Sequence, residues 1–173
     1  MYNSGFYAIF VFHIKSIDML KMVLFAVLLS LSAYGQTLSE ADRICGLYYA
    51  ADPDNGEGSQ IQIYKTASGT YEGKVVWMQY PNHPNGEPRR DVKNPNPHNR
   101  NQTNVGLVVI KGFTYNSAND EWENGSVYNP KSGKTYSSFI KLESDNKLKV
   151  RGYLGVSLLG KTVVWTKETT LRK

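Results

Sequence analysis

The chain lacks most of the features that mark an enzyme. It has one cysteine, Cys45, so it can form no intrachain disulfide, and a lone cysteine beside an apolar strand is most often a small core residue. It contains no Gly-x-Ser-x-Gly motif and no glycine-rich phosphate loop that opens a helix. Its basic residues are scattered, which argues against a nucleic-acid partner. We therefore expect no catalytic residues and no cofactor.

Histidine is also scarce, which narrows the scope for a metal site. Two of the three histidines, His83 and His98, fall in the same polar segment as Asp91. Imidazole and carboxylate groups suit several divalent ions, so these three residues form one alternative. Histidines in a solvated segment rich in Pro and Asn are more often simply solvated. We predict no metal site, and convergence of the three side chains would be the sign of one.

The N-terminal region predicts export. Lys21 precedes a short apolar run over residues 22–32, and Ala33-Tyr34-Gly35 places small residues at the −3 and −1 positions of a cut before Gln36. This order is typical of a secretory signal peptide, whereas a membrane anchor needs about 17–25 apolar residues. We expect residues 1–35 to be removed. The protein would then be periplasmic or secreted, with no membrane span.

The first eighteen residues fit this signal poorly, because a signal peptide rarely carries a long preamble. Met19 offers a natural start just before Lys21, so we expect residues 1–18 to come from an upstream start assignment. The formal net charge of the whole chain is +5. Residues 1–35 hold two lysines and one aspartate, so the chain that follows carries +4 and is mildly basic.

Beyond residue 36 the pattern is that of β-structure. A short lead covers residues 36–44, and segments of alternating polar and apolar residues follow, separated by turn clusters such as Asp52-Pro53-Asp54-Asn55-Gly56. Strands are predicted over residues 46–51, 60–66, 70–80, 107–113, 121–128, 134–142, 147–154 and 161–167. About eight strands at hairpin spacing, with no amphipathic helix, predict an all-β, antiparallel up-and-down barrel over residues 45–168. Residues 169–173 form a tail.

Residues 81–104 interrupt this regular succession of strands and short turns. The segment is rich in Pro, Asn and Gly and has almost no apolar residue, so we predict a long loop. Bonds from Asx side chains would hold it in shape, and we expect an ordered loop built on Asp91, Asn94, Asn96 and Arg100. The loop would act either as a lid over the barrel mouth or as a contact surface for an envelope protein.

Several motifs, in order, resemble the bacterial domain-of-unknown-function 2147 family, which is placed near the lipocalins and other calycins. They are Gly46-Leu47-Tyr48, Gly73-Lys74-Val75-Val76, Asp91 with Asn94-Pro95-Asn96-Pro97 and Arg100, Lys111-Gly112-Phe113, Tyr128-Asn129-Pro130, Gly133-Lys134-Thr135-Tyr136, Val150-Arg151-Gly152-Tyr153-Leu154-Gly155 and Ser157-Leu158-Leu159-Gly160-Lys161-Thr162 with Trp165. The resemblance covers residues 45–167. It implies an exported β-barrel with no established biochemical activity.

One residue departs from the calycin pattern. Calycins typically open with Gly-x-Trp, whose indole fills the barrel floor against a basic residue of the last strand. Here Tyr48 stands at the Trp position, and the resemblance leaves Lys167 or Arg151 as the cation. A tyrosine ring can fill the floor and accept a cation over its face.

Aromatic residues are spread over every predicted strand. In a small closed barrel, inward side chains either fill the interior or line one ligand cavity. In the strand over residues 70–80 we place Tyr71, Val75 and Trp77 on one face, whereas alternation places Arg151 outward. The candidate ligand-binding residues of the interior or mouth are Tyr48, Tyr71, Trp77, Trp122, Tyr136, Arg151 and Trp165.

Two functions follow from these alternatives. The first is a binding protein that holds a small apolar or amphipathic ligand in the barrel. The second is a filled barrel that contacts or inhibits an envelope protein through residues 81–104. An enzyme is the least favoured alternative, because the chain shows no catalytic constellation.

Overall fold

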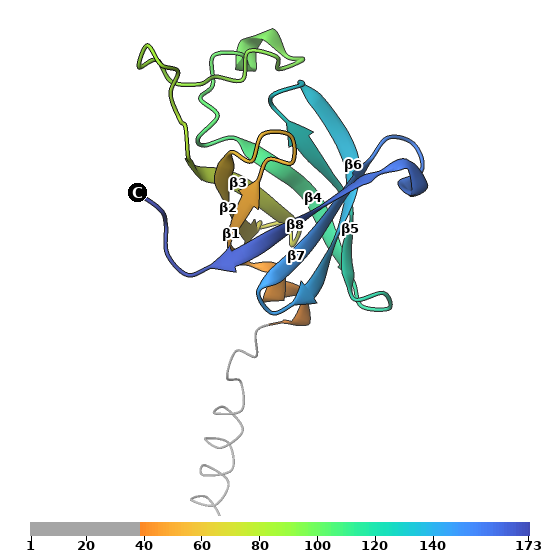
Figure 1. Cartoon of the computed structure of the whole chain (residues 1–173). Coiled ribbons are helices and arrows are strands. Elements are labelled where there is room, and N and C mark those ends of the chain that lie inside the picture. The colour runs from red at the N-terminus through yellow and green to blue at the C-terminus, as the bar shows by residue number, and fades with distance from the viewer. Residues whose placement is uncertain (1–38) are drawn as a thin grey trace, which may run out of the picture. The chain divides into compact units, whose positions relative to one another are not determined.

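The computed structural model describes residues 39–173, and in them eight antiparallel strands close into one barrel (Figure 1). The strands are β1 (Gly46–Ala51), β2 (Gly58–Lys65), β3 (Tyr71–Met78), β4 (Val108–Asn116), β5 (Glu121–Asn129), β6 (Lys134–Ser144), β7 (Lys147–Tyr153) and β8 (Lys161–Glu168). Each strand pairs with its neighbour in sequence, and β8 pairs with β1. The predicted up-and-down barrel is confirmed. The predicted signal peptide lies outside the described residues.

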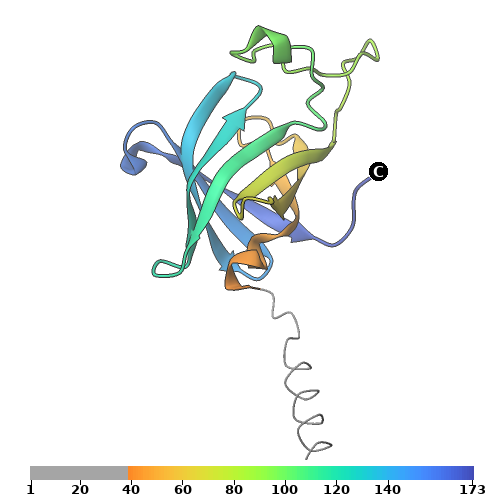
Figure 2. The same ribbon diagram turned by 180° about the vertical axis from the view of Figure 1, so that it is seen from behind.

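The barrel has two unlike ends (Figures 1 and 2). At the floor the strands join through tight hairpins, and a short 3-10 helix, η1 (Glu40–Ile44), lies beneath them. At the mouth three of the four connections are longer than the floor hairpins, and residues 79–107 between β3 and β4 form the longest. Two further 3-10 helices, η2 (Pro97–Asn99) and η3 (Ser157–Leu159), lie in these mouth connections. Among residues 39–173 no helix is long and apolar enough to cross a membrane.

Inward side chains form one continuous apolar core. Its largest fully buried members are aromatic, and all eight strands contribute to it or pack against it. The core residues are Ile44, Tyr48, Ile61, Ile63, Tyr71, Val75, Leu107, Val109, Ile110, Phe113, Trp122, Ile140, Leu148, Val150 and Trp165. Gly125 faces Phe113 so closely that a Cβ atom there would collide with the ring. The lower part of the barrel is therefore filled with side chains.

A plug of side chains and η1 closes the floor. Tyr48 is fully buried, and the Lys167 ammonium lies 5.7 Å from its ring centroid. Lys167 Nζ also donates to the Arg43 carbonyl, at 3.3 Å, which joins β8 to η1. Trp122 Nε1 donates to the Ala41 carbonyl at 3.0 Å. Tyr48 thus occupies the predicted floor position, and Lys167 is its cation.

A β-bulge at Val76 in β3 changes which way the end of that strand faces. The register between β2 and β3 shifts between Gln60 and Ile61, so that Ile61 pairs with Val75 whereas Gln60 pairs with Trp77. The placement of Trp77 on the same face as Tyr71 and Val75 is therefore wrong, because the extra residue turns Trp77 to the outer face.

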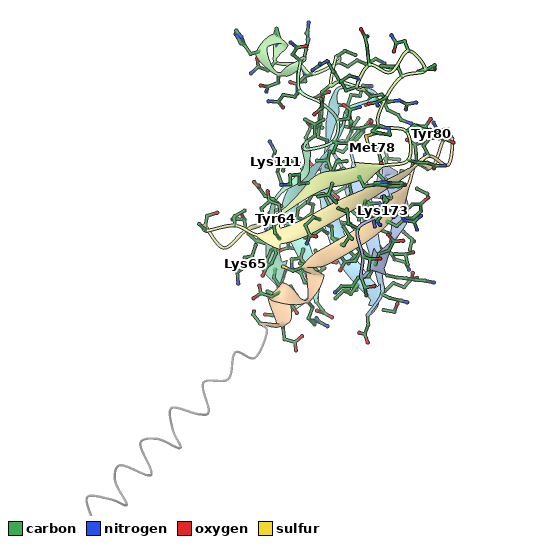
Figure 3. The ribbon with its side chains drawn as sticks, turned by 90° about the vertical axis from the view of Figure 1, so that its left-hand side faces the viewer. Tyr64, Lys65, Met78, Tyr80, Lys111 and Lys173 are labelled. Atoms are coloured by element: carbon green, nitrogen blue, oxygen red, sulfur yellow. The ribbon has the colours of Figure 1, made fainter. Side chains whose placement is uncertain are left out.

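The C-terminal tail covers this outer face (Figure 3). Gln60 Nε2 donates to the Thr170 carbonyl at 3.0 Å, and the Arg172 N–H donates to Gln60 Oε1 at 2.8 Å. The Arg172 guanidinium lies 4.4 Å from the Tyr49 ring centroid and 5.7 Å from that of Trp77. The tail thus buries the Gln60 side chain completely, although it faces away from the barrel interior.

The floor plug makes a stability prediction. The Tyr48 hydroxyl is buried and has no hydrogen-bond partner among residues 39–173, and burial raises the pKa of Tyr48 above its ordinary value. A buried hydroxyl without a partner is costly, so Tyr48→Phe should leave the free energy of unfolding unchanged or higher. Tyr48→Ala should lower it by about 3–5 kcal/mol through the cavity it leaves. Urea unfolding of both variants measures this, and a clear loss in Tyr48→Phe would contradict it.

Candidate functional site

Inward side chains near the mouth are partly exposed, as are Tyr115 and Leu142 beside the floor hairpins. On β6, Ile140 is fully buried, whereas Tyr136, which faces the same way nearer the mouth, is half-buried. On β8 the same change occurs from Trp165 to Val163. Because these positions face the inside of a closed barrel, solvent reaches them from the mouth. We call the half-buried set the mouth residues: Met78, Val127, Tyr136 and Val163.

Ion pairs between different loops cross the rim above the mouth residues. Glu57 of the β1–β2 connection accepts from Arg89 of the long loop at 2.9 Å. Lys131, in the turn between β5 and β6, lies 2.9 Å from Asp52 and 3.6 Å from Glu57. These rim ion pairs join three of the four connections at this end of the barrel, using charged side chains that are only partly exposed.

The long loop is organised around one buried carboxylate. Asp91 has no exposed surface and accepts from the Tyr128 hydroxyl and from Asn94 Nδ2, both at 2.6 Å. Its own N–H donates to the Gln102 carbonyl at 2.9 Å. Burial, and then the bond to Asp91, raise the pKa of Tyr128 above its ordinary value. These bonds attach the loop to β5.

Further bonds from the predicted residues shape the same loop. Asn96 Oδ1 accepts from the His98 N–H and caps η2, and Arg100 Nε donates to the Asn94 carbonyl at 2.8 Å. The backbone of Gly133, with φ +70°, passes so close to the loop that a side chain there would strike the Lys93 carbonyl. All four predicted loop residues therefore make bonds within the loop.

The candidate metal ligands do not come together. Within residues 39–173 no three His, Cys, Asp or Glu side chains lie close enough to hold a metal ion. His83 and His98 are exposed, whereas Asp91 is buried against Tyr128.

The predicted interior residues separate into three groups. Tyr48, Tyr71, Trp122 and Trp165 belong to the buried core, and Tyr136 lies at the mouth. Trp77 is a correction, since it lies on the outer face beneath Arg172.

Arg151 also lies on the outer face, as alternation predicts. Its guanidinium donates to the Ser157 and Leu158 carbonyls at 3.0 and 3.2 Å and to Thr162 Oγ1 at 2.8 Å. It therefore shapes the β7–β8 connection.

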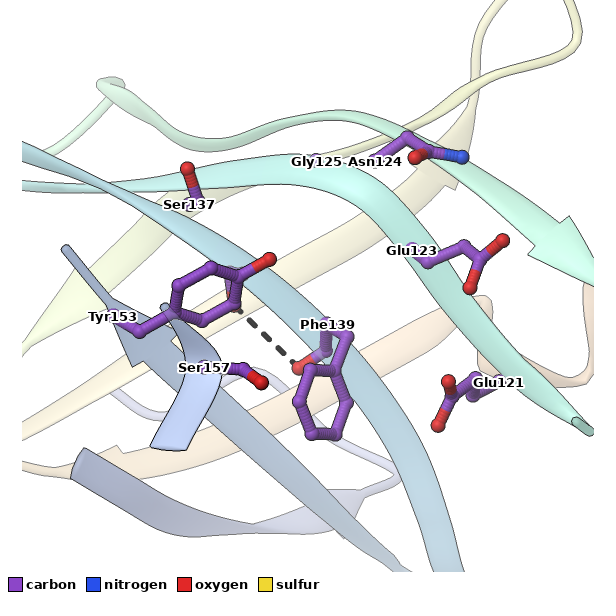
Figure 4. A pocket seen from close by; sticks show the side chains of 9 residues that line it. Glu121, Glu123, Asn124, Gly125, Ser137, Phe139, Tyr153 and Ser157 are labelled. Carbon is purple, nitrogen blue, oxygen red and sulfur yellow. Dashed lines mark hydrogen bonds between the residues drawn. The ribbon is translucent and has the colours of Figure 1, made fainter. Parts of the chain in front are cut away.

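The structure also has a groove on the outer face of the barrel, which the sequence pattern did not predict. It has a volume of about 440 Å³ and lies over the outer face of β5, β6 and β7 (Figure 4). Its lining residues are Glu121, Glu123, Asn124, Gly125, Ser137, Ser138, Phe139, Tyr153 and Ser157. The available signal was the alternation of Glu121 and Glu123 about the inward Trp122. However, the residues of three strands and one loop meet there only through the register of the barrel.

The closed eight-stranded barrel, with a plugged floor and a mouth that carries its loops, is of the lipocalin-like class of small β-barrel proteins. The chain belongs to the bacterial family described as "Uncharacterized protein conserved in bacteria (DUF2147)", which matches residues 46–167. A similar solved structure is protein HP1028 from the human pathogen Helicobacter pylori, which is described as belonging to the lipocalin family.

That structure has a TM-score of 0.62 and 22% sequence identity, and the match covers 73% of this chain and 83% of HP1028. At this identity the likeness concerns the fold. No curated protein matches the chain.

The buried Asp91 carboxylate generates one prediction. Asp91→Asn keeps the shape of the side chain but replaces one carboxylate oxygen, an acceptor, with an amide NH2 group, a donor. That group would face the Tyr128 hydroxyl or Asn94 Nδ2, which already donate to Asp91. We expect a loss of about 1–3 kcal/mol in the free energy of unfolding and faster proteolysis within residues 81–104. Asp145→Asn, in the exposed β6–β7 turn, is the matched control and should change neither. Equal behaviour of the two variants in urea unfolding and limited proteolysis would contradict the prediction.

The rim ion pairs generate a pH prediction. Burial by itself would raise the pKa of Glu57, but the bond from Arg89 and the charges of Arg89 and Lys131 outweigh it, so the pKa lies below its ordinary value. The stabilisation is therefore present above the ordinary glutamate pKa of about 4.3 and is lost as the pH falls through the lower folded value. NMR titration of the Glu57 carboxyl should show the lowered midpoint.

Two variants complete this test. Arg89→Gln should return the Glu57 midpoint toward the ordinary value, because it removes the main partner. Arg90→Gln should leave the midpoint unchanged, since Arg90 bonds to the Asn101 carbonyl instead. An equal shift in both variants would show that Arg89 is not the cause.

Proposed function

We propose that this protein is an exported, lipocalin-like binding protein that holds a small amphipathic ligand at the mouth of its barrel. One observation carries the proposal: apolar and tyrosine side chains that face the inside of the barrel are half-buried beneath a charged rim. An apolar surface beside a few polar groups is the usual composition of a small-molecule site. Export is supported by the signal peptide expected over residues 1–35.

The filled lower barrel supports a ligand position near the mouth. Core residues below the mouth are 0–7% exposed, so the apolar part of a ligand would contact Met78, Val127 and Val163. The Tyr136 hydroxyl and the rim charges would meet its polar part. Partly exposed ion pairs are worth at most about 1 kcal/mol each, so a ligand displaces the rim ion pairs at low cost.

A second candidate function is contact with an envelope protein through residues 81–104. The loop is held in one shape by the buried Asp91, and a preformed loop loses little conformational entropy on binding. Its exposed basic residues Arg90 and Lys93 would supply the contact charge.

Gly152 offers a way to block the mouth. It pairs with Ser138 across β6 and β7, and a Cβ atom built on it would lie 3.4 Å from the Tyr136 Cβ, an ordinary contact. Gly152→Leu should therefore fill the space beside Tyr136 and still fold. Thr166→Leu adds a similar side chain at an exposed position of β8 and serves as the control.

The test has two measurements. Native mass spectrometry of the protein purified from its own envelope should show a small molecule bound to the chain that begins at Gln36. The second measurement is the binding of the amphipathic dye anilinonaphthalene sulfonate to residues 36–173. Binding should weaken at least tenfold in Gly152→Leu, because the loss of one buried apolar contact is worth about that factor. It should stay within about twofold in Thr166→Leu.

Two results would overturn the proposal. One is an empty protein whose dye binding is the same in both variants. The other is a co-purified protein that is lost in Arg90→Glu/Lys93→Glu, which would establish the second candidate.

A further inference from the structure

The β7–β8 loop, residues 154–160, exposes large aliphatic side chains. Leu158 and Leu159 are 85% and 79% exposed, and Val156 and Leu154 are 61% and 59% exposed. Isolated exposed leucines are ordinary, but four aliphatic residues gathered on one short loop are typical of an interaction site. The loop projects from the side of the barrel near β7 and β8 (Figures 1 and 2).

This loop is held in shape from below. Arg151 donates to the Ser157 and Leu158 carbonyls, and the Leu159 N–H donates to the Val156 carbonyl at 3.2 Å. These bonds satisfy backbone carbonyl and N–H groups that would otherwise lose their hydrogen bonds to water when a partner binds. The aliphatic side chains are therefore presented outward at little further cost in entropy.

The outer groove adjoins this loop, because Ser157 of the loop and Tyr153 at the end of β7 both line the groove. Figure 4 shows Glu121 and Glu123 on one side of the groove, Tyr153 and Ser157 on the other, and Phe139 between them. Within the described part of the chain neither glutamate forms an ion pair within 4 Å. Glu123 accepts from Asn116 Nδ2 at 2.9 Å. The groove therefore offers two carboxylates beside aromatic rings.

We propose that the outer groove and the β7–β8 loop together dock an extended segment of another protein that carries an arginine flanked by aliphatic residues. A guanidinium stacks on aromatic rings and pairs with carboxylates in a fixed geometry, which suits Phe139, Glu121 and Glu123. The aliphatic neighbours of the arginine would contact Leu158 and Leu159. Arginine anchors beside apolar contacts are common at the centres of protein interfaces.

A lipid surface fits these observations less well. An apolar loop can enter a bilayer, but Glu121 and Glu123 would then face anionic headgroups across a short distance, which is unfavourable. The docking surface lies on the outside of the barrel, so the proposal does not depend on a ligand at the mouth.

The probe is a blocked peptide, Ser-Leu-Arg-Leu-Ser, titrated into residues 36–173 and followed by amide chemical shifts in NMR. This part contains the whole compact unit Ser39–Lys173. We expect shifts confined to β5, β6, β7 and the β7–β8 loop, and none with the counterpart that carries Glu in place of Arg. A peptide this short binds weakly, which NMR titration tolerates.

Paired variants test the two halves of the surface. Glu121→Gln/Glu123→Gln should weaken binding about fivefold through the lost ion pairs, and Leu158→Ser/Leu159→Ser about tenfold through the lost apolar contact. The control Glu87→Gln/Asp145→Asn removes the same charge at exposed positions elsewhere and should leave binding unchanged.

Three outcomes would overturn the proposal. The first is the absence of localised shifts with the arginine peptide, or equal shifts with the glutamate peptide. The second is a dependence of the same amide shifts on protein concentration without peptide, which would assign the surface to a second copy of the chain. The third is cosedimentation with phosphatidylglycerol vesicles that is lost in Leu158→Ser/Leu159→Ser, which would assign it to a membrane.

Discussion

The barrel depends on one short seam, where the first strand meets the last. β1 and β8 pair through three residue pairs, and Tyr48 opposite Lys167 is the middle one. The ammonium above the Tyr48 ring joins the two strands inside the barrel, and its bond to Arg43 brings η1 against the floor. A neutral aromatic ring accepts the cation over its face, so the Tyr48 ring can hold Lys167 at the floor.

The two ends of the barrel are held by different forces, and this difference separates stability from function. The floor is closed chiefly by aromatic burial, which is strong and insensitive to salt, and the ion pairs Arg43–Asp120 and Lys65–Asp42 add to it. The rim is joined by partly exposed ion pairs, which are weak and screened by salt. Motion is therefore expected at the mouth, where the half-buried inward residues lie, whereas the floor stays closed. The outer groove stands apart from both, because it lies over the outer face of β5, β6 and β7.

The sequence predicts the strands well because alternation and turn clusters are local signals. It places Tyr48 at the floor and leaves Lys167 or Arg151 as the cation, although alternation turns Arg151 outward. The pairing of β1 with β8 selects Lys167. It misplaces Trp77, because the extra residue Val76 in β3 reverses the face of that strand, and the alternation of residue types does not reveal it. The outer groove and the contact of Arg172 with Trp77 are beyond sequence reasoning, since both join segments distant in the chain.

The pairing of the first and last strands and the C-terminal tail set the order in which parts of the barrel form. Tyr48 and Lys167 stand at opposite ends of the folded part, so their pairing closes nearly the longest loop that the chain can form, at a large entropic cost. Residues 170–172 then cover the outside of the same region. A chain still being synthesised exposes the free edges of β1 and β7, which invite wrong pairing. The barrel therefore closes only after β8 is available to pair with β1, and a chain that lacks residues 170–172 would lose the covering of its seam.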